Sequence, residues 1–319
     1  MRKELIDLNA SLGSVAVIGG SNLDIVGSPA KVLIRGDSNI GSVKLSPGGV
    51  GRNIAENSAL LGIPTMLFSV VGSDSFGDYL ILEAKKSGID VDHVKRVDGP
   101  TGIYLAILDE NKDMDLAINA MNIMEELDWK YISVNRALIE ESDIIMVDAN
   151  LKKDVLERIV SEFSHKKLFL DTVSTAKAES AAEFIGSFHT IKPNRIEAET
   201  LTGIKIQDRN DLVKAAHILH DKGVSNVCIT LGKDGVFFSS HSGSQGGFKS
   251  SEFVPVNATG AGDAFQAGLI YGELNNLPLR DSIRYAMGAA IVAMSSEDTI
   301  NKEMSIDKIE GISKRLEEI

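Results

Sequence analysis

Short runs of apolar residues alternate with amphipathic segments along most of the chain. The apolar runs are rich in β-branched residues, which predicts strands buried on both faces of a parallel sheet. The expected strands are 15–18, 65–71, 144–147, 168–170, 190–191 and 227–230. Between them, segments such as 53–61, 211–221 and 261–274 carry apolar residues at helical spacing. The alternation predicts an α/β fold in which helices cover a parallel sheet.

Two regions interrupt this alternation and predict a small additional sheet. Residues 31–46 are polar and mixed, with strand-like stretches around Asp37, Ser38 and Asn39. Residues 101–120 are typical of a hairpin with a polar turn at 109–113. Strands without a helix to cover them suit a β-sheet lid over a ligand site. We expect one domain over residues 14–319, with lid strands at about 31–46 and 101–120, after an N-terminal extension at 1–13.

Composition and charge narrow the class of protein. Hydrophobic residues make up 43% of the 319 residues, enough for a large core, and the formal net charge is −12. An acidic chain offers no broad basic face to a phosphate backbone, which argues against a nucleic acid polymer as partner. Cys228 is the only cysteine, so an internal disulfide is impossible. Without an apolar run of about 18 residues or a signal core, we expect no membrane contact and a cytoplasmic enzyme.

The segment NATGAGDAF at 257–265 carries the sharpest functional signal. Small residues before a helical stretch leave backbone N–H groups unpaired at the helix start, where they form an anion site with the helix dipole. Gly260 and Gly262, with Ala261 between them, let the backbone approach a phosphoryl group closely. Asp263 lies in the first turn, where a carboxylate can accept a proton from an attacking alcohol. An ordinary helix start with an acidic residue is the alternative.

A second glycine-rich turn, PGGVGRN at 47–53, also precedes a helix. Gly48 and Gly49 allow the backbone near a polar ligand, and Asn53 offers both a donor and an acceptor to hydroxyls. Asp24 follows an earlier strand, where a parallel sheet binds ligands, and its carboxylate can accept two hydrogen bonds from a diol. The chain has no P-loop motif, and 260–265 lacks the third glycine of the dinucleotide fingerprint.

Together, the two turns resemble the signatures of the ribokinase-like (PfkB) carbohydrate kinases. GGVGRN at 48–53 resembles the first signature and TGAGD at 259–263 the second, and the resemblance runs from about residue 15 to residue 295. It implies a Rossmann-type three-layer α/β sandwich with a β-sheet lid over the sugar. It also implies that Asp263 is the catalytic base and that the amides of residues 260–262 form an anion hole. The implied sugar-binding residues are Asp24, Gly48, Gly49 and Asn53.

Two further motifs resemble the family's ATP-binding elements. KPNRIE at 192–197 resembles an N-x-x-E motif, which implies that Asn194 and Glu197 organise Mg²⁺ and phosphate, often through water. The alternative is an N-capped helix with an exposed acid. TLGKDG at 230–235 resembles a strand-end turn that contacts ATP. The implied ATP-binding residues are Thr230, Gly232, Gly235, Thr259 and Asn194. Many relatives carry Asp where this chain has Asn257, which makes activation by K⁺ doubtful.

Within the family, the chain resembles bacterial pseudouridine kinases in GGVGRN, in Asp37-Ser38-Asn39 and in AINAMN at 117–122. Asn119 and Asn122 close the predicted hairpin, near where a nucleobase would project from a bound ribose. Their amides can pair with a uracil-like edge. A site that pairs with the N1–H of pseudouridine would reject uridine, which lacks it.

The resemblance therefore implies ATP-dependent phosphorylation of the 5′-hydroxyl of pseudouridine. Three alternatives stay open. The serine and asparagines of the lid can be turn residues only. The acceptor can be ribose, a purine nucleoside or a hexose phosphate. The chain can also be a nucleoside-binding regulator without catalysis. Exposed lid strands further predict a homodimer that pairs through the lid.

Overall fold

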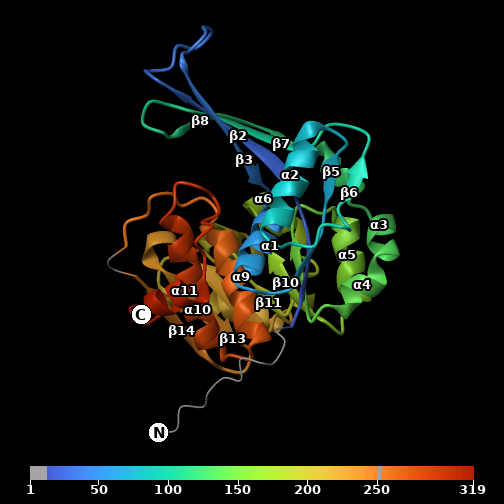
Figure 1. The fold of residues 1–319 in the computed structure, drawn as a ribbon. Coiled ribbons are helices and arrows are strands. Elements are labelled where there is room, and N and C mark those ends of the chain that lie inside the picture. The colour runs from blue at the N-terminus through green and yellow to red at the C-terminus, as the bar shows by residue number, and fades with distance from the viewer. Residues whose placement is uncertain (1–12, 251–252) are drawn as a thin grey trace.

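A central nine-stranded sheet runs through the protein in the order β15-β14-β13-β12-β11-β10-β9-β1-β4 (Figure 1). The computed structural model describes residues 13–250 and 253–319. The parallel strands are β1 (Val15–Ile18), β4 (Thr65–Phe68), β9 (Ile144–Asp148), β10 (Lys167–Asp171), β11 (Thr190–Ile191) and β12 (Asn226–Thr230). The antiparallel strands are β13 (Val236–Ser240), β14 (Gln245–Lys249) and β15 (Glu317–Glu318). The predicted strand 65–71 divides in two, because β5 (Val70–Gly72) leaves the main sheet and pairs with β6 (Lys95–Val97).

Helices cover both faces of this sheet and so make three layers. Val15 and Val17 of β1 pack in the core on one face, and Ala16 and Ile18 pack in the core on the other. The first face carries α1 (Val50–Leu60), α2 (Ser75–Lys86), α9 (Ala261–Leu274), α10 (Leu279–Met294) and α11 (Ile306–Ser313). The second carries α3 (Trp129–Val134), α4 (Arg136–Glu141), α5 (Lys153–Glu162), α6 (Thr175–Ala181), α7 (Arg195–Thr202) and α8 (Arg209–Asp221). Burial on both faces explains the continuous apolar runs and confirms the predicted α/β sandwich.

A second sheet of four strands, in the order β3-β2-β7-β8, forms the lid (Figure 1). Its strands are β2 (Asn22–Pro29), β3 (Gly41–Gly48), β7 (Ile103–Leu108) and β8 (Met114–Ala120). The hairpin expected at 101–120 is present as β7 and β8. The strand-like stretches expected around residues 37–39 are wrong, because residues 31–40 contain no strand and only connect β2 to β3.

Local hydrogen bonds close that connection. Asn39 Oδ1 accepts from the Ile34 amide at 2.8 Å, and Asn39 Nδ2 donates to the Ile34 carbonyl at 3.0 Å. The first lid strand, β2, begins at Asn22 and pairs with both β3 and β7. Asp24 therefore belongs to the lid sheet.

The predicted N-terminal extension at 1–13 lies outside the described residues except for Gly13. No helix in the described part of the chain is long and apolar enough to cross a membrane.

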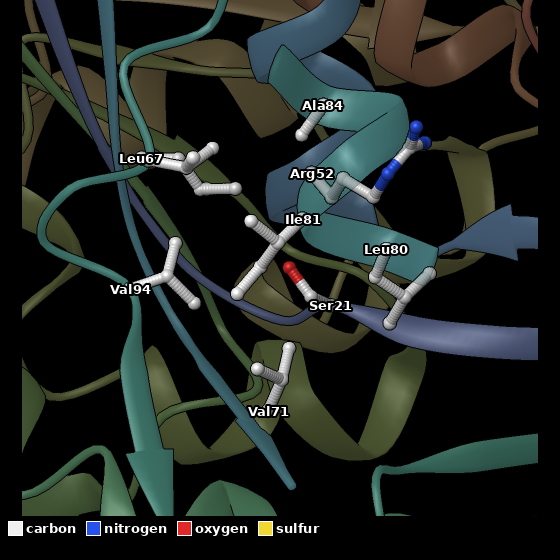
Figure 2. Close-up of a pocket in the computed structure, with 9 residues that line it drawn as sticks. Ser21, Arg52, Leu67, Val71, Leu80, Ile81, Ala84 and Val94 are labelled. Carbon is white, nitrogen blue, oxygen red and sulfur yellow. The ribbon is translucent and has the colours of Figure 1, made fainter. Parts of the chain in front are cut away.

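A buried ion pair lies within α1, and its carboxylate also contacts Ser87 after α2 and Lys302. Arg52 Nη2 lies 2.7 Å from Glu56 Oε2, and both side chains are almost fully buried. Figure 2 shows the Arg52 guanidinium pointing away from a small apolar pocket that includes Leu67 and Val71. Ser87 Oγ donates to Glu56 Oε1 at 2.6 Å, and Lys302 Nζ pairs with the same oxygen. Glu56 is thus the anion that compensates a guanidinium charge inside the protein.

Glu56→Gln should destabilise the protein by about 3–5 kcal/mol, because it leaves the buried Arg52 charge without an anion. The loss is measured as the change in unfolding free energy in urea. Lys302→Gln is the matched control, since the Lys302 side chain is 56% exposed and pairs with the same carboxylate. It should cost no more than about 1 kcal/mol. Equal losses in the two variants would contradict the importance of burial.

Candidate active site

Asp263 lies in the first turn of α9, and this helix begins at a glycine in the left-handed backbone conformation. Gly260 has a φ of 80°, and a Cβ at this residue would overlap the Thr299 carbonyl oxygen. Only glycine fits both conditions. The first amides of an α-helix have no intrahelical acceptor. The Ala261 amide donates to the Ala258 carbonyl at a long 3.4 Å, so this predicted member of the anion hole is only weakly engaged.

A buried hydrogen bond joins the two glycine motifs. Asn53 Nδ2, on α1, donates to Asp263 Oδ2, on α9, over 2.9 Å. Asn53 Oδ1 is buried and has no hydrogen-bond partner among the described residues. A buried acceptor without a partner is costly unless a ligand supplies the donor. The structure therefore brings the predicted base and a predicted sugar-binding residue together, with an amide oxygen left for a hydroxyl.

The environment of Asp263 makes its carboxylate a much stronger base than usual. The pKa of Asp263 is raised to about 7, chiefly by burial and then by the negative charge of Asp171. The hydrogen bond from Asn53 and the charge of Lys192 lower this pKa, whereas Asp148 adds to the increase. A pKa near neutrality suits a general base that works at neutral pH.

A buried lysine next to the predicted anion hole was not found from the sequence. Lys192 Nζ lies 3.0 Å from Asp171 Oδ2, and both side chains are less than a tenth exposed. A Cβ built on Gly262 would lie 3.3 Å from Lys192 Nζ, so the ammonium group faces the second motif from close by. Burial alone would lower the pKa of Lys192, but the charge and hydrogen bond of Asp171 raise it. The lysine therefore stays a cation where phosphate oxygens are expected.

The residues predicted to bind the acceptor sugar lie on turns that pack closely against one another. Asn22 Nδ2 donates to Asp24 Oδ1 at 2.6 Å, and burial raises the pKa of Asp24. A Cβ at Gly48 would overlap the Asp24 carboxylate. Gly49 has a φ of 98°, and a Cβ there would overlap the Gly20 carbonyl. The glycines are required because the Asp24 carboxylate and the Gly20 backbone occupy the space of their side chains.

The predicted Mg²⁺ residues form a capping box at the start of α7. Asn194 Oδ1 accepts from the Glu197 amide at 3.0 Å, and Glu197 Oε2 accepts from the Asn194 amide at 2.9 Å. Glu197 Oε2 also accepts from Thr172 Oγ1 at 2.6 Å, and Oε1 accepts from Asn194 Nδ2 at 2.8 Å. Glu197 is buried, so the alternative of an exposed acid is wrong. Because these bonds occupy most of its lone pairs, the donor set fits Mg²⁺ held through water better than by direct contact. Among the described residues, no cluster of acidic, histidine or cysteine side chains could hold a metal ion.

The predicted nucleotide turn lies next to this capping box. Thr230 pairs with Asn194 in an isolated bridge, and its amide donates to the Pro193 carbonyl at 3.0 Å. Gly232 and Gly235 adopt φ values of 61° and 92°, which tighten the turn after β12. The amide of Thr259 donates to Asn257 Oδ1 at 2.9 Å, which orders the loop before α9.

The predicted lid residues separate into two groups. Asn119 pairs with Tyr104 of β7, and Tyr104 pairs with Asp24 of β2, so the three residues form one row across the lid. Residues in such a row point to the same face of a sheet, about 5 Å apart from strand to strand. Asn122 is exposed and lines a cavity of about 310 Å³ together with Asn150 and others.

Asp37, Ser38 and Asn39 lie at the opposite end of the lid. β2 and β3 pair from Asn22 with Gly48 to Pro29 with Gly41, and residues 37–39 follow beyond that last pair. A strand of eight residues spans about 25 Å. Within one chain, the structure therefore does not bring these three residues to Asp263.

Three charged residues to which the sequence assigned no role lie at the same edge of the central sheet. Asp148 and Asp171 are the last residues of β9 and β10, and Lys192 directly follows β11. Ligands of open parallel sheets bind at the carboxyl ends of the strands. A charged residue directly after a buried apolar run was the signal that could have found them.

Comparison with known proteins identifies the family of this chain. The family model described as pfkB family carbohydrate kinase matches residues 13–306. Pseudouridine kinase of Escherichia coli is 38% identical over 296 residues, which cover 92% of this chain and 95% of that protein. A carbohydrate kinase from Agrobacterium tumefaciens has a TM-score of 0.82 and 25% identity, and covers 97% of this chain and 100% of its own. Arabidopsis thaliana ribokinase, complexed with ribose and ATP, has a TM-score of 0.81 and 21% identity, with coverage of 95% and 99%. The chain therefore belongs to the pfkB family of carbohydrate kinases and is an ATP-dependent sugar or nucleoside kinase.

Proposed function

We propose that the protein transfers the γ-phosphoryl group of ATP to the 5′-hydroxyl of pseudouridine, with Asp263 as the general base. The contact between Asn53 and Asp263 carries the proposal, because it places a hydroxyl-binding amide beside a carboxylate whose pKa is about 7. The similarity to a pseudouridine kinase supports the choice of acceptor. The products are pseudouridine 5′-phosphate and ADP.

Each part of the site has a task in this transfer. Asp263 takes the proton of the 5′-hydroxyl while the oxygen attacks the γ-phosphorus and the bond to the leaving ADP breaks. Lys192 and the first amides of α9, including that of Gly262, stabilise the negative charge on the transferred group. Asp24, Gly49 and Asn53 hold the sugar hydroxyls. The lid excludes water, which limits hydrolysis of ATP.

Mg²⁺ would be held at the start of α7 by Asn194 and Glu197 through water, and it supplies positive charge to the phosphates when bound. Asn194 also connects this position to the nucleotide turn through its bridge to Thr230. Gly232, Gly235 and Thr259 complete the surface that we assign to ATP.

The row of lid residues supports a nucleoside as acceptor. Asp24 would bind the ribose, and Asn119 lies two strands away in the same row, about 10 Å distant. This spacing suits a base attached to the bound ribose. Asn122 and Asn150, which line one cavity, would offer further amide groups to the base. These groups can pair with the carbonyl and N–H groups of a uracil edge.

Pseudouridine should be the preferred acceptor when ADP release is measured with Mg-ATP against uridine, ribose, adenosine and fructose 6-phosphate. We expect kcat/KM for pseudouridine to exceed that for uridine by about 100-fold or more, because uridine leaves the N1–H partner unsatisfied. Preference for another acceptor would contradict the base-reading lid but keep Asp263 as the base. Nucleoside binding without any turnover would indicate a regulator.

Asn119→Ala separates the lid from the rest of the site in the same assay. It should reduce the preference for pseudouridine over uridine, since the amide that reads the base is lost. Asn111→Ala, in the exposed turn between β7 and β8, is the matched control and should leave the preference unchanged.

The pH dependence of kcat should report the titration of Asp263. Its raised pKa predicts that kcat falls about tenfold per pH unit below about 7, because only the deprotonated carboxylate accepts the proton. Asp263→Asn should lower kcat by about 10³-fold or more at pH 8 and leave acceptor affinity largely intact. A flat profile down to pH 5, or near-normal turnover in the variant, would remove Asp263 from its role.

The face of the lid turned away from Asp24 supports a homodimer. Leu45, Ile25, Leu105 and Ile118 form one row across the four strands, and Val43 and Leu116 belong to the next row of the same face. The exposed fractions of Leu116 and Ile118 are 56% and 54%, which is unusual for such large apolar side chains. We propose that two copies pair through this face.

Leu116→Lys combined with Ile118→Lys should convert the dimer into a monomer, because the two lysines would bring charge into the apolar interface. The measurement is the molar mass by light scattering after size-exclusion chromatography. Val134→Lys replaces an exposed apolar residue on α3, outside the lid, and should leave the dimer intact. A monomeric wild-type protein would contradict the lid interface.

A further inference from the structure

A single buried carboxylate joins two glycine turns on the acceptor side of the site, one at residues 19–20 and the other at residues 48–51. Asp148 ends β9 and has no exposed surface. Its Oδ2 accepts hydrogen bonds from the Gly20 amide at 2.7 Å and from the Gly51 amide at 2.9 Å. Its Oδ1 accepts from the Asn150 amide at 3.0 Å. Burial raises the pKa of Asp148, and the hydrogen bonds from the backbone amides oppose part of this increase.

The glycines around Asp148 leave no free space between the turns. A Cβ at Gly19 would overlap the Asp148 carboxylate, and a Cβ at Gly51 would lie 2.7 Å from the Gly19 Cα. The Gly20 carbonyl accepts from the Arg52 amide at 3.0 Å, which adds a direct bond between the turns. The carboxylate therefore fills the gap between two backbone segments that contact each other directly.

These contacts reach the reacting groups through α1. Gly51 lies in the first turn of α1, two residues before Asn53, and Asn53 Nδ2 donates to Asp263 Oδ2. A shift of the Gly51 amide would move Asn53 relative to Asp263. The hydrogen bonds of Asp148 lie on the acceptor side, and none of those described involves the nucleotide turn at 230–235.

We propose that Asp148 is a positioning residue for the acceptor: its carboxylate sets the distance between the two glycine turns and thereby places Asn53 beside Asp263. The inference rests on the proposed function for the assignment of these turns to the acceptor. It does not depend on which sugar or nucleoside binds there.

The pH dependence of kcat provides a second test of the role of Asp148. The groups that face Asp263 are Asp148 from β9, Asp171 from β10, Lys192 after β11 and the neutral Asn53 from α1. The charges of Asp171 and Asp148 raise the pKa of Asp263, and Lys192 lowers it. Removing the Asp148 charge should therefore shift the acidic limb of the kcat profile to lower pH.

Asp148→Ala removes the oxygen that accepts from both the Gly20 and the Gly51 amide, whereas an asparagine could still accept from both through its carbonyl oxygen. With the best acceptor of the panel, KM for the acceptor should rise about tenfold or more, because small displacements of binding groups are costly. KM for ATP should stay within about twofold of the wild-type value, since the nucleotide turn is untouched. Asp128→Ala, which removes a carboxylate that accepts the Tyr131 amide at the start of α3, should change neither constant.

Gly51→Ala provides an independent test if Asp148→Ala does not fold. Its Cβ would push the same two turns apart while the carboxylate remains, so it should also raise KM for the acceptor and spare KM for ATP. Circular dichroism and thermal unfolding establish that each variant is folded. A folded variant of either kind with an unchanged acceptor KM, or with both KM values raised equally, would overturn the positioning role. An active enzyme that prefers another acceptor would contradict only the pseudouridine assignment.

Discussion

The hydrogen bond between Asn53 and Asp263 is the contact on which the rest of the site depends. It joins side chains 210 residues apart in the sequence, and it forms because α1 and α9 begin next to each other on one face of the sheet. Both helices start at a glycine with positive φ, which lets the chain turn sharply above the sheet. A hydroxyl bound by Asn53 is therefore already beside the group that takes its proton.

Charge in the site is arranged to keep that proton acceptor basic. Asp148 and Asp171, at the carboxyl ends of β9 and β10, lie near Asp263 at the start of α9, with Lys192 as the buried cation among them. Asp263 therefore binds a proton more readily than an exposed carboxylate. The arrangement costs stability, because buried carboxylates lose hydration. Residues kept at such a cost are typical of functional sites. The same surroundings hold Lys192 charged at the position where phosphate oxygens would gather.

The sequence predicted the fold and the two glycine motifs because their signals are local. Apolar runs, helical spacing and glycines before a helix can each be recognised within about ten residues. Asp148, Asp171 and Lys192 were missed because their role arises only when β9, β10 and β11 lie side by side. The first lid strands were misplaced for a related reason. The sequence of residues 31–40 does not show that β2 already pairs with β3 from Asn22 to Pro29 and with β7 from Leu23 to Gly27. Asp37 and Asn39 therefore lie beyond the end of the pairing between β2 and β3.

The most direct measurement of this account is the pKa of the Asp263 carboxyl group itself, followed by carbon-13 NMR of aspartate-labelled protein. Comparison of the wild type with Asp263→Asn assigns the signal. The account predicts titration at about pH 7, because burial and the charge of Asp171 outweigh Lys192 and the hydrogen bond from Asn53. Titration near 4, the usual value for an exposed aspartate, would contradict it. It would mean that burial and the charge of Asp171 do not make Asp263 a base suited to neutral pH.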